Sequence, residues 1–169
     1  MANIQVRALT DADAGLLEQF TSLAVWTPQI ITLPSAELRA DPRLAQYWQG
    51  FGRPGDAGFA ALIGRETVGA AWARLMSGSA PGYGHVDDQT PELSIAVVPK
   101  WRGKGVGTQL MDALLEALTE AGYQSVSLSV QQANPAVGLY KRFGFTVVRV
   151  HDAEYIMVRS LCPIDDSVA

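Results

Sequence analysis

The stretch VVPKWRGKGVGT at residues 97–108 decides how the rest of the sequence is interpreted. An apolar segment leads into a loop with three alternating glycines, and an amphipathic helix is expected to begin inside that loop. The first N–H groups of a helix lack partners within the helix, and the helix dipole adds positive potential there. Glycines let the backbone approach a phosphate closely, and Lys100, Arg102 and Lys104 add cations. The stretch therefore predicts an anion site of the kind that holds a phosphorylated cofactor.

Two common phosphate-binding motifs do not fit this stretch. A Walker loop needs a Lys followed by Ser or Thr after its second glycine, whereas Val106 follows Gly105. A dinucleotide fingerprint needs G-x-G-x-x-G, whereas Gly103, Gly105 and Gly107 are evenly spaced. The remaining match is R-x-x-G-x-G, with Arg102, Gly105 and Gly107 at the named positions. This pattern resembles the acyl-CoA signature of the GNAT superfamily of N-acetyltransferases.

A second segment, NPAVGLYKRFGF at residues 134–145, extends the resemblance. It looks like the family's second element, which begins with Asn, continues to Tyr and ends in Gly-Phe, with Gly138 where alanine is common. The resemblance implies that Asn134 contacts the cofactor arm and that the Tyr140 hydroxyl lies near the thioester sulfur. From the residues alone, Asn134 is also a good helix N-cap and Tyr140 could be a core aromatic. A phenol is nevertheless a suitable proton donor to a leaving thiolate.

The pattern along the chain predicts a mixed α/β, α+β-like domain over residues 1–163, with a tail at 164–169. Strands are expected at 4–8, 59–63, 67–76, 93–98, 125–130, 145–150 and 155–159. Helices are expected after Thr10, from Ser35 to Trp48 with a break near Asp41, over 105–121, and from Asn134 to Gly144. The strand–helix–strand unit at 93–130 should be parallel. The resemblance implies a mostly antiparallel sheet of about six to seven strands with a splayed parallel pair, flanked by about four helices.

The resemblance also implies where acetyl-CoA would bind. Pantetheine would lie between the strands at 93–98 and 125–130, with its amides bonded to the backbone near Ile95 and Val97. The expected cofactor contacts are Ile95, Val97, Val98, Arg102, Gly103, Lys104, Gly105, Val106, Gly107, Thr108, Asn134 and Tyr140. The expected catalytic residues are Tyr140 and Glu92.

The expected reaction is direct attack of a neutral amine on the acetyl carbonyl. Glu92 opens the splayed strand and resembles an acidic residue often found there in the family. It would take the amine's proton directly or through water; the alternative is an exposed carboxylate at a strand end. Asp87, Asp88 and His85 are weaker candidates for the base. Several aromatic residues could line an acceptor pocket, although most are expected to pack in the core: Trp26, Tyr47, Trp48, Trp72 and Tyr83.

Composition limits the other function classes. The chain has 169 residues, a net charge of −4, and 48% hydrophobic residues, which predicts a globular protein without general attraction for nucleic acid. Cys162 is the one cysteine, so neither a disulfide within the chain nor a cysteine metal cluster is expected, and Cys162 is a poor acyl carrier. We expect a cytoplasmic enzyme without a metal or a membrane segment, acting on a small-molecule or peptide amine, with a homodimer also compatible. The alternatives are an acyl-CoA-binding regulatory domain without catalysis and a nucleotide-binding protein.

Overall fold

A seven-stranded mixed sheet organises the computed structural model, which describes residues 2–26, 34–76 and 81–162. The strand order is β1-β2-β3-β4-β5-β7-β6. The strands are β1 (Ile4–Ala8), β2 (Ala57–Ile63), β3 (Glu66–Arg74), β4 (Glu92–Val97), β5 (Ser125–Gln131), β6 (Thr146–His151) and β7 (Glu154–Ser160). The β4–β5 pair is parallel, and the other neighbouring pairs are antiparallel. The predicted mixed sheet is confirmed.

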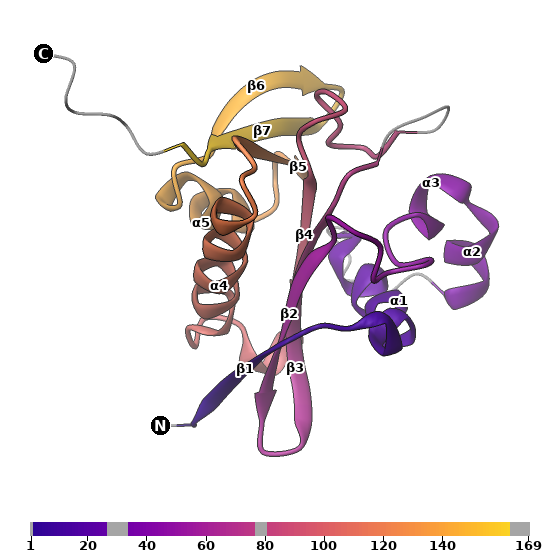
Figure 1. Ribbon diagram of the computed structural model, residues 1–169, viewed down its shortest axis with the longest axis vertical. Helices are drawn as coiled ribbons and strands as arrows, with labels where there is room; N and C mark the ends of the chain where they lie inside the picture. Colours follow the sequence, from indigo (N-terminus) through magenta and orange to yellow (C-terminus); the bar gives the residue numbers. More distant parts are fainter. Residues whose placement is uncertain (1, 27–33, 77–80, 163–169) are drawn as a thin grey trace, which may run out of the picture.

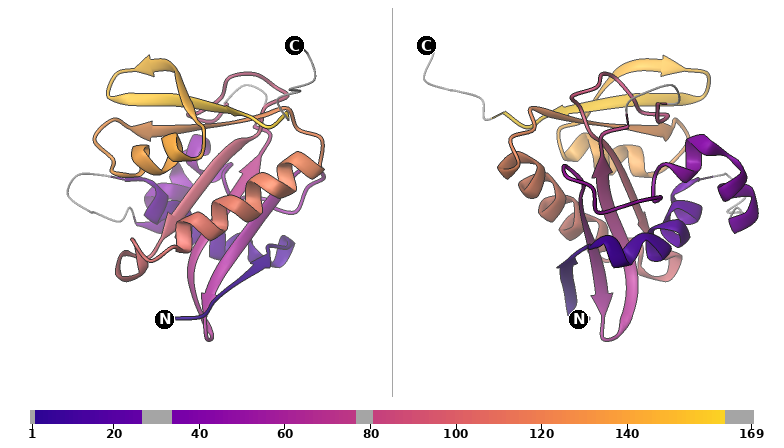
Figure 2. Two further views of the ribbon diagram at one scale, coloured as in Figure 1. Left: turned by 90° about the vertical axis from the view of Figure 1, so that its left-hand side faces the viewer. Right: turned by 45° about the vertical axis from the view of Figure 1, so that its right-hand side comes forward.

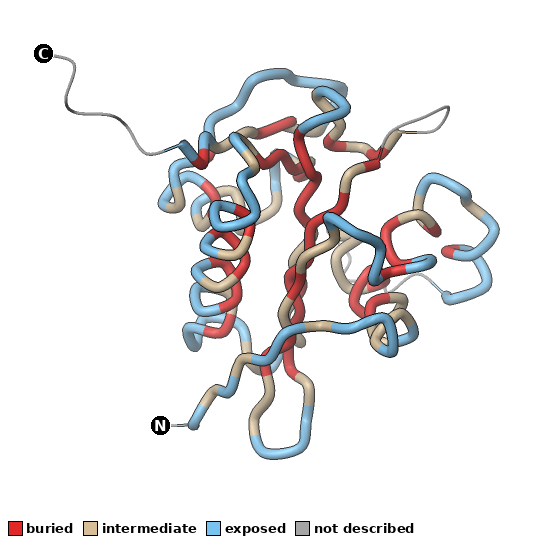
Figure 3. Tube along the Cα trace, in the orientation of Figure 1, coloured by how far each residue is buried: buried red, intermediate tan, exposed pale blue. Residues whose placement is uncertain are grey.

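The helices cover both faces of the sheet (Figures 1 and 2). On one side lie α4 (Val106–Glu120) and α5 (Ala136–Arg142); on the other lie α1 (Ala14–Ala24), α2 (Ser35–Ala40) and α3 (Pro42–Ala45). Two short 3₁₀ helices, Asp11–Asp13 and Pro99–Trp101, precede α1 and the glycine loop. Each side has its own buried core against the sheet (Figure 3).

The apolar stripe of α4 explains its position on the sheet. Leu110, Leu114 and Leu118 recur every fourth residue and are fully buried, so one face of the helix packs on β2 and β3. Gly122, with φ of 89°, follows the last turn, as a left-handed glycine commonly does at a helix end. The helix predicted at 105–121 is therefore confirmed within a residue at each end.

The segment after α2 differs from the prediction. Asp41 interrupts the helix as expected, and its side chain accepts a hydrogen bond from the Arg43 N–H at 2.9 Å, so that it caps α3. However, α3 ends at Ala45 instead of continuing to Trp48. The carbonyls of Gln46, Gln49 and Gly50 accept hydrogen bonds from the Arg74 side chain, and the chain forms turns there.

The parallel pair is splayed. The paired positions of β3 and β4 extend from Arg74 opposite Glu92 to Gly69 opposite Val97. By contrast, β4 and β5 pair in parallel only where Glu92 lies opposite Ser127. Beyond Glu92 the two strands separate, so the sheet opens in the direction of the glycine loop.

The expected tail at 164–169 lies outside the described residues, as does part of the loop predicted at 77–89. Within the described ranges, every helix is too short or too polar to cross a bilayer.

Candidate active site

A cleft of about 830 Å³ occupies the opening between β4 and β5. This volume falls in the range of small-molecule and cofactor sites. The cleft continues from the glycine loop and the start of α5, between the two strands, to the end of α1 and the segment after α3. It therefore joins the two faces of the sheet. Most of the predicted cofactor contacts line it: Ile95, Val97, Arg102, Gly103, Gly105, Gly107, Thr108, Asn134 and Tyr140.

The glycine loop delivers the start of α4 to this cleft. Gly105 precedes the first helical residue with φ of 87°, and Gly103 has φ of 72°. L-residues rarely adopt these values, whereas glycine does so without a steric penalty. The first i to i−4 bond of the helix joins the Gln109 N–H to the Gly105 carbonyl at 3.1 Å. The N–H groups of residues 106–108 precede that bond, and they are the donors that a helix start offers to an anion.

Three predicted cofactor contacts lie outside the cleft lining. The Val98 N–H donates to the Val68 carbonyl at 2.9 Å and is already satisfied. The Val106 side chain belongs to the core, so only its backbone can serve a ligand. The Lys104 ammonium lies 4.8 Å from the centre of the Trp101 ring, in a cation–π contact.

Arg102 does line the cleft, and its side chain has a partner within the protein. Its Nε donates to the Val97 carbonyl at 2.9 Å. This bond ties the loop to the end of β4. It also engages a main-chain carbonyl near which a pantetheine amide was expected.

Asn134 and Tyr140 each combine a packing role with a place in the cleft. The Asn134 side-chain oxygen accepts a hydrogen bond from the Ala136 N–H at 2.9 Å, which stabilises the first turn of α5. Tyr140 is buried against Phe145, with 6.0 Å between ring centres and an edge-to-face angle of 62°. Burial raises the pKa of the Tyr140 hydroxyl above its ordinary value, so this group stays protonated at neutral pH.

Glu92 is buried, with 4% of its surface exposed, so the alternative of an exposed carboxylate is wrong. Its Oε1 accepts hydrogen bonds from the Tyr47 hydroxyl and, at 2.9 Å, from the Gly84 N–H. Burial raises the pKa of Glu92 to about 7, and the two hydrogen bonds oppose that rise. A carboxylate with this pKa can accept a proton near neutral pH.

The weaker base candidates lie away from the cleft lining. His85 pairs with Asp88 at 3.6 Å, and the Asp87 side chain accepts a hydrogen bond from the Gln89 N–H at 2.9 Å. Among the predicted aromatic residues, Trp26, Tyr47 and Tyr83 line the cleft. Trp48 and Trp72 are core residues, as expected for most of this group.

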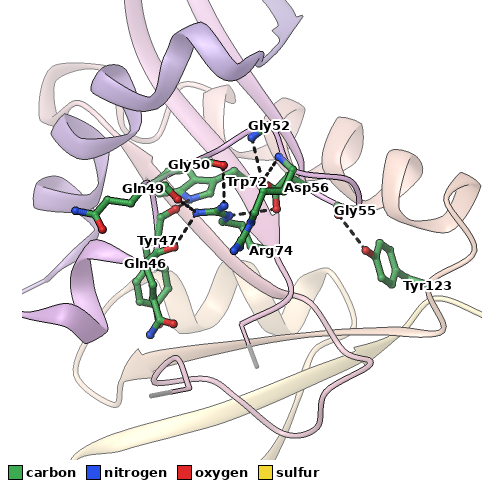
Figure 4. Close-up of polar contacts among 11 residues, drawn as sticks. Gln46, Tyr47, Gln49, Gly50, Gly52, Gly55, Asp56, Trp72, Arg74 and Tyr123 are labelled. Atoms are coloured by element: carbon green, nitrogen blue, oxygen red, sulfur yellow. Dashed lines mark hydrogen bonds and ion pairs between the residues drawn. The ribbon is translucent and has the colours of Figure 1, made fainter. Parts of the chain in front are cut away.

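Arg74 and Asp56 form a buried polar cluster that sequence analysis missed (Figure 4). The Arg74 side chain is 1% exposed and pairs with Asp56 at 3.1 Å. It also donates to the carbonyls of Gln46 at 2.8 Å, Gln49 at 2.7 Å and Gly50 at 3.2 Å. Trp72 adds a bond from its indole N–H to the Tyr47 carbonyl at 2.8 Å. The available signal was a lone arginine in an otherwise apolar strand, which requires buried partners.

The chain is similar to known acetyltransferases in sequence and in fold. The model of the acetyltransferase (GNAT) family matches residues 20–145. A ribosomal protein bS18-alanine N-acetyltransferase of Haemophilus influenzae is 34% identical over 68 residues, which span 40% of this chain and 47% of that protein. An L-methionine sulfoximine/L-methionine sulfone acetyltransferase of Pseudomonas paraeruginosa is 32% identical over 133 residues, covering 73% of this chain and 66% of that protein.

Solved structures share the fold. The PaiA N-acetyltransferase from Thermoplasma acidophilum, in complex with coenzyme A, superposes with a TM-score of 0.68 at 16% identity. The match covers 94% of this chain and 99% of that one. The family model spans the second half of α1, the splayed strand, the glycine loop and α5, which are the elements that build the cleft. The chain therefore belongs to the acetyltransferase (GNAT) family.

Proposed function

We propose that this protein transfers an acetyl group from acetyl-CoA to a primary amine. One observation carries the proposal: a single cleft joins the phosphate-binding helix start to a buried carboxylate across the splayed strands. The donor would bind with its pyrophosphate at residues 103–108 and its pantetheine arm between β4 and β5. The acceptor would enter from the end of α1 and the segment after α3. The coenzyme A bound to the Thermoplasma structure supports this choice of donor.

The reaction would proceed by direct attack. The amine nitrogen forms a bond to the acetyl carbon, the carbon–sulfur bond breaks, and coenzyme A leaves as a thiolate. Glu92 receives the proton that the amine loses, and Tyr140 supplies the proton that the thiolate gains. The raised pKa values of both groups fit these roles, because Glu92 can accept a proton near neutrality and Tyr140 retains its own.

The acceptor would be an amine carried by a peptide or a small molecule. The Haemophilus relative is named for the alanine of a ribosomal protein, and the Pseudomonas relative for methionine derivatives. The acceptor end of the cleft offers apolar walls from Leu23, Val25 and Leu44, beside the hydroxyls of Tyr47 and Tyr83. Such walls suit the aliphatic part of an amine-bearing molecule.

The test is a screen of peptides, amino acids and small amines for thiol release from acetyl-CoA. We expect turnover with at least one amine, and a large loss of kcat in Tyr140→Phe while acetyl-CoA affinity by calorimetry is kept. Tight acetyl-CoA binding without turnover across the screen would favour a regulatory domain. Tight ATP binding without acetyl-CoA binding would favour a nucleotide-binding protein.

A further inference from the structure

Both oxygens of the Glu92 carboxylate have neighbours within the protein. Oε1 holds the Tyr47 hydroxyl and the Gly84 N–H. Oε2 is buried and has no hydrogen-bond partner among the described residues. It lies against Gly82, where any Cβ would overlap it, with the end of the Met76 side chain close by. Glu92 lines the cleft, but its Oε1 already accepts two hydrogen bonds and its Oε2 is buried against the protein.

The Tyr47 hydroxyl lies between Glu92 and the cleft. It donates its proton to Glu92 Oε1, and it accepts a hydrogen bond from the Tyr83 N–H at 3.0 Å. A phenol oxygen has two lone pairs, so one remains after the bond from Tyr83. Tyr47 lines the cleft, so this remaining lone pair is an acceptor, connected to Glu92, that an amine in the cleft could meet.

We propose that Tyr47 relays the acceptor's proton to Glu92, an inference that rests on the proposed acetyltransferase function. As the carbon–nitrogen bond forms, the proton on nitrogen moves to the Tyr47 oxygen. The hydroxyl proton of Tyr47 moves at the same time to Glu92 Oε1. Tyr47 ends the step as it began, Glu92 is protonated, and the thiolate takes its proton from Tyr140. Glu92 then returns its proton to solvent and Tyr140 takes a proton back, so both groups are restored before the next turnover.

The electrostatics of Tyr47 require the two transfers to be concerted. Burial and the adjacent Glu92 carboxylate raise the pKa of Tyr47 well above its ordinary value. A tyrosinate would therefore be costly, and Tyr47 can only pass a proton while receiving another.

Two side chains of β3 hold Tyr47 in place. Trp72 bonds to its carbonyl, and Arg74 bonds to the carbonyls of Gln46 and Gln49 on either side (Figure 4). Arg74 is also the residue opposite Glu92 in the β3–β4 register. Arg74 therefore adjoins both members of the relay: it holds the loop that carries Tyr47, and it lies opposite Glu92 in the sheet.

The test compares Tyr47→Phe with Tyr123→Phe, using the best amine found in the screen. Tyr123 is the matched control, because its hydroxyl also donates a hydrogen bond, to the Gly55 carbonyl at 3.0 Å, but it lies outside the cleft. We expect Tyr47→Phe to lose about 100-fold in kcat/KM for the amine, which is typical of lost acid–base catalysis. Acetyl-CoA affinity and the melting temperature should stay near those of the control. A Tyr47→Phe enzyme within about threefold of the control would overturn the relay.

The pH profile and a double variant separate a relay from a structural role. The Tyr47 hydrogen bond lowers the pKa of Glu92, so its loss should move the acid limb of kcat/KM to higher pH. The other charged groups that act on Glu92, Arg43 and Glu154, are unchanged in the variant. Because the two residues act in series, Tyr47→Phe combined with Glu92→Gln should be no slower than the slower single variant. An unmoved acid limb, or losses that multiply, would contradict the relay.

If Tyr47→Phe does not fold, the turnover of Tyr47→His tests the relay instead, because imidazole can still accept and donate a proton. A turnover at least about tenfold above that of Glu92→Gln supports the relay, and a turnover no higher than that of Glu92→Gln overturns it. The outcomes also distinguish the two proposals. Absence of acetyl transfer by the unmodified protein would refute the proposed function itself. Normal transfer by Tyr47→Phe, with Glu92→Gln inactive, would end only the relay.

Discussion

At the scale of a single residue, the raised pKa of Glu92 makes the stability of the protein depend on pH. This pKa is 4.5 when free and about 7 in the fold, chiefly because of burial. Below pH 4.5 both states hold the proton and burial of the neutral acid carries no charge penalty. Between pH 4.5 and 7 the unfolded chain releases the proton first, so stability falls as pH rises. At about 1.4 kcal/mol per pH unit, the full effect is about 3 kcal/mol above pH 7.

We predict that Glu92→Gln removes this pH dependence while keeping the acceptor oxygen for Tyr47 and Gly84. Urea unfolding at pH 4.5 and pH 8 measures it in both proteins. The stability of Glu92→Gln relative to the unmodified protein should increase by about 3 kcal/mol from the lower to the higher pH. A relative stability that does not change with pH would contradict the raised pKa.

Two glycines at the start of α4, Gly105 and Gly107, should respond to alanine in opposite ways. Gly105 has φ of 87°, so Gly105→Ala should cost about 1–2 kcal/mol of stability through backbone strain alone. Gly107 lies within α4, and a Cβ there would meet Leu139 at 3.6 Å, an ordinary contact. Gly107→Ala should therefore keep or raise stability, by up to about 1 kcal/mol from helix propensity. Because the methyl would line the cleft, acetyl-CoA affinity should nevertheless fall. Thermal unfolding and calorimetry measure the two effects, and equal destabilisation by both variants would refute this distinction.

Local sequence pattern reveals one half of the site better than the other. Gly105, Asn134 and Tyr140 belong to two continuous motifs, so the resemblance to a known family could suggest the donor side. Tyr47 and Glu92 are 45 residues apart, and only the fold brings them together. Burial of Glu92 could not be predicted either, because Gly82 and Gly84 come from a loop without a regular pattern.

At the scale of elements, the loop after α3 depends on a strand residue for its shape. Strand and helix order follow from periodicity, and apart from the two short 3₁₀ helices the predicted order is the one observed in the described ranges. The early end of α3 was not predicted, because the carbonyls after Ala45 accept hydrogen bonds from Arg74, which lies nearly thirty residues along the chain. Helix propensity is a local quantity, and such a distant donor can override it.

We predict that Arg74→Lys destabilises the protein by about 3 kcal/mol, because one ammonium cannot replace the guanidinium at three carbonyls and a carboxylate. Turnover should fall as well, since Tyr47 lies in the loop that Arg74 holds. Acetyl-CoA affinity should be kept, because the glycine loop proposed to bind the pyrophosphate lies elsewhere in the fold. Arg39→Lys is the control: Arg39 is 64% exposed and pairs with Glu18 at 2.8 Å, so its loss should cost under about 1 kcal/mol. An equal loss of stability in the two variants would contradict the structural role of Arg74 in the loop after α3.

At the scale of the whole molecule, the splayed strands leave the sheet joined at one parallel pair of residues between its two halves. A ligand between β4 and β5 should therefore tie the halves together. We predict that acetyl-CoA at about 100 times its Kd stabilises the protein by about 2.7 kcal/mol. Hydrogen exchange should slow at Ile95 and Val97 as well as in the glycine loop. ATP is the control ligand and should leave β4 unchanged; protection confined to the loop would mean that the gap is not the binding site.

The unpaired edges of β4 and β5 also bear on how this protein can change over generations. The peptide groups that face the opening are the same whichever side chains the strands carry, so among substitutions only proline, which lacks the N–H, removes one of these donors. The walls at the other end of the cleft consist of side chains such as Leu23, Leu44 and Tyr83, and each can be exchanged singly. Descendants of this sequence are therefore free to acquire new acceptors while inheriting the same donor.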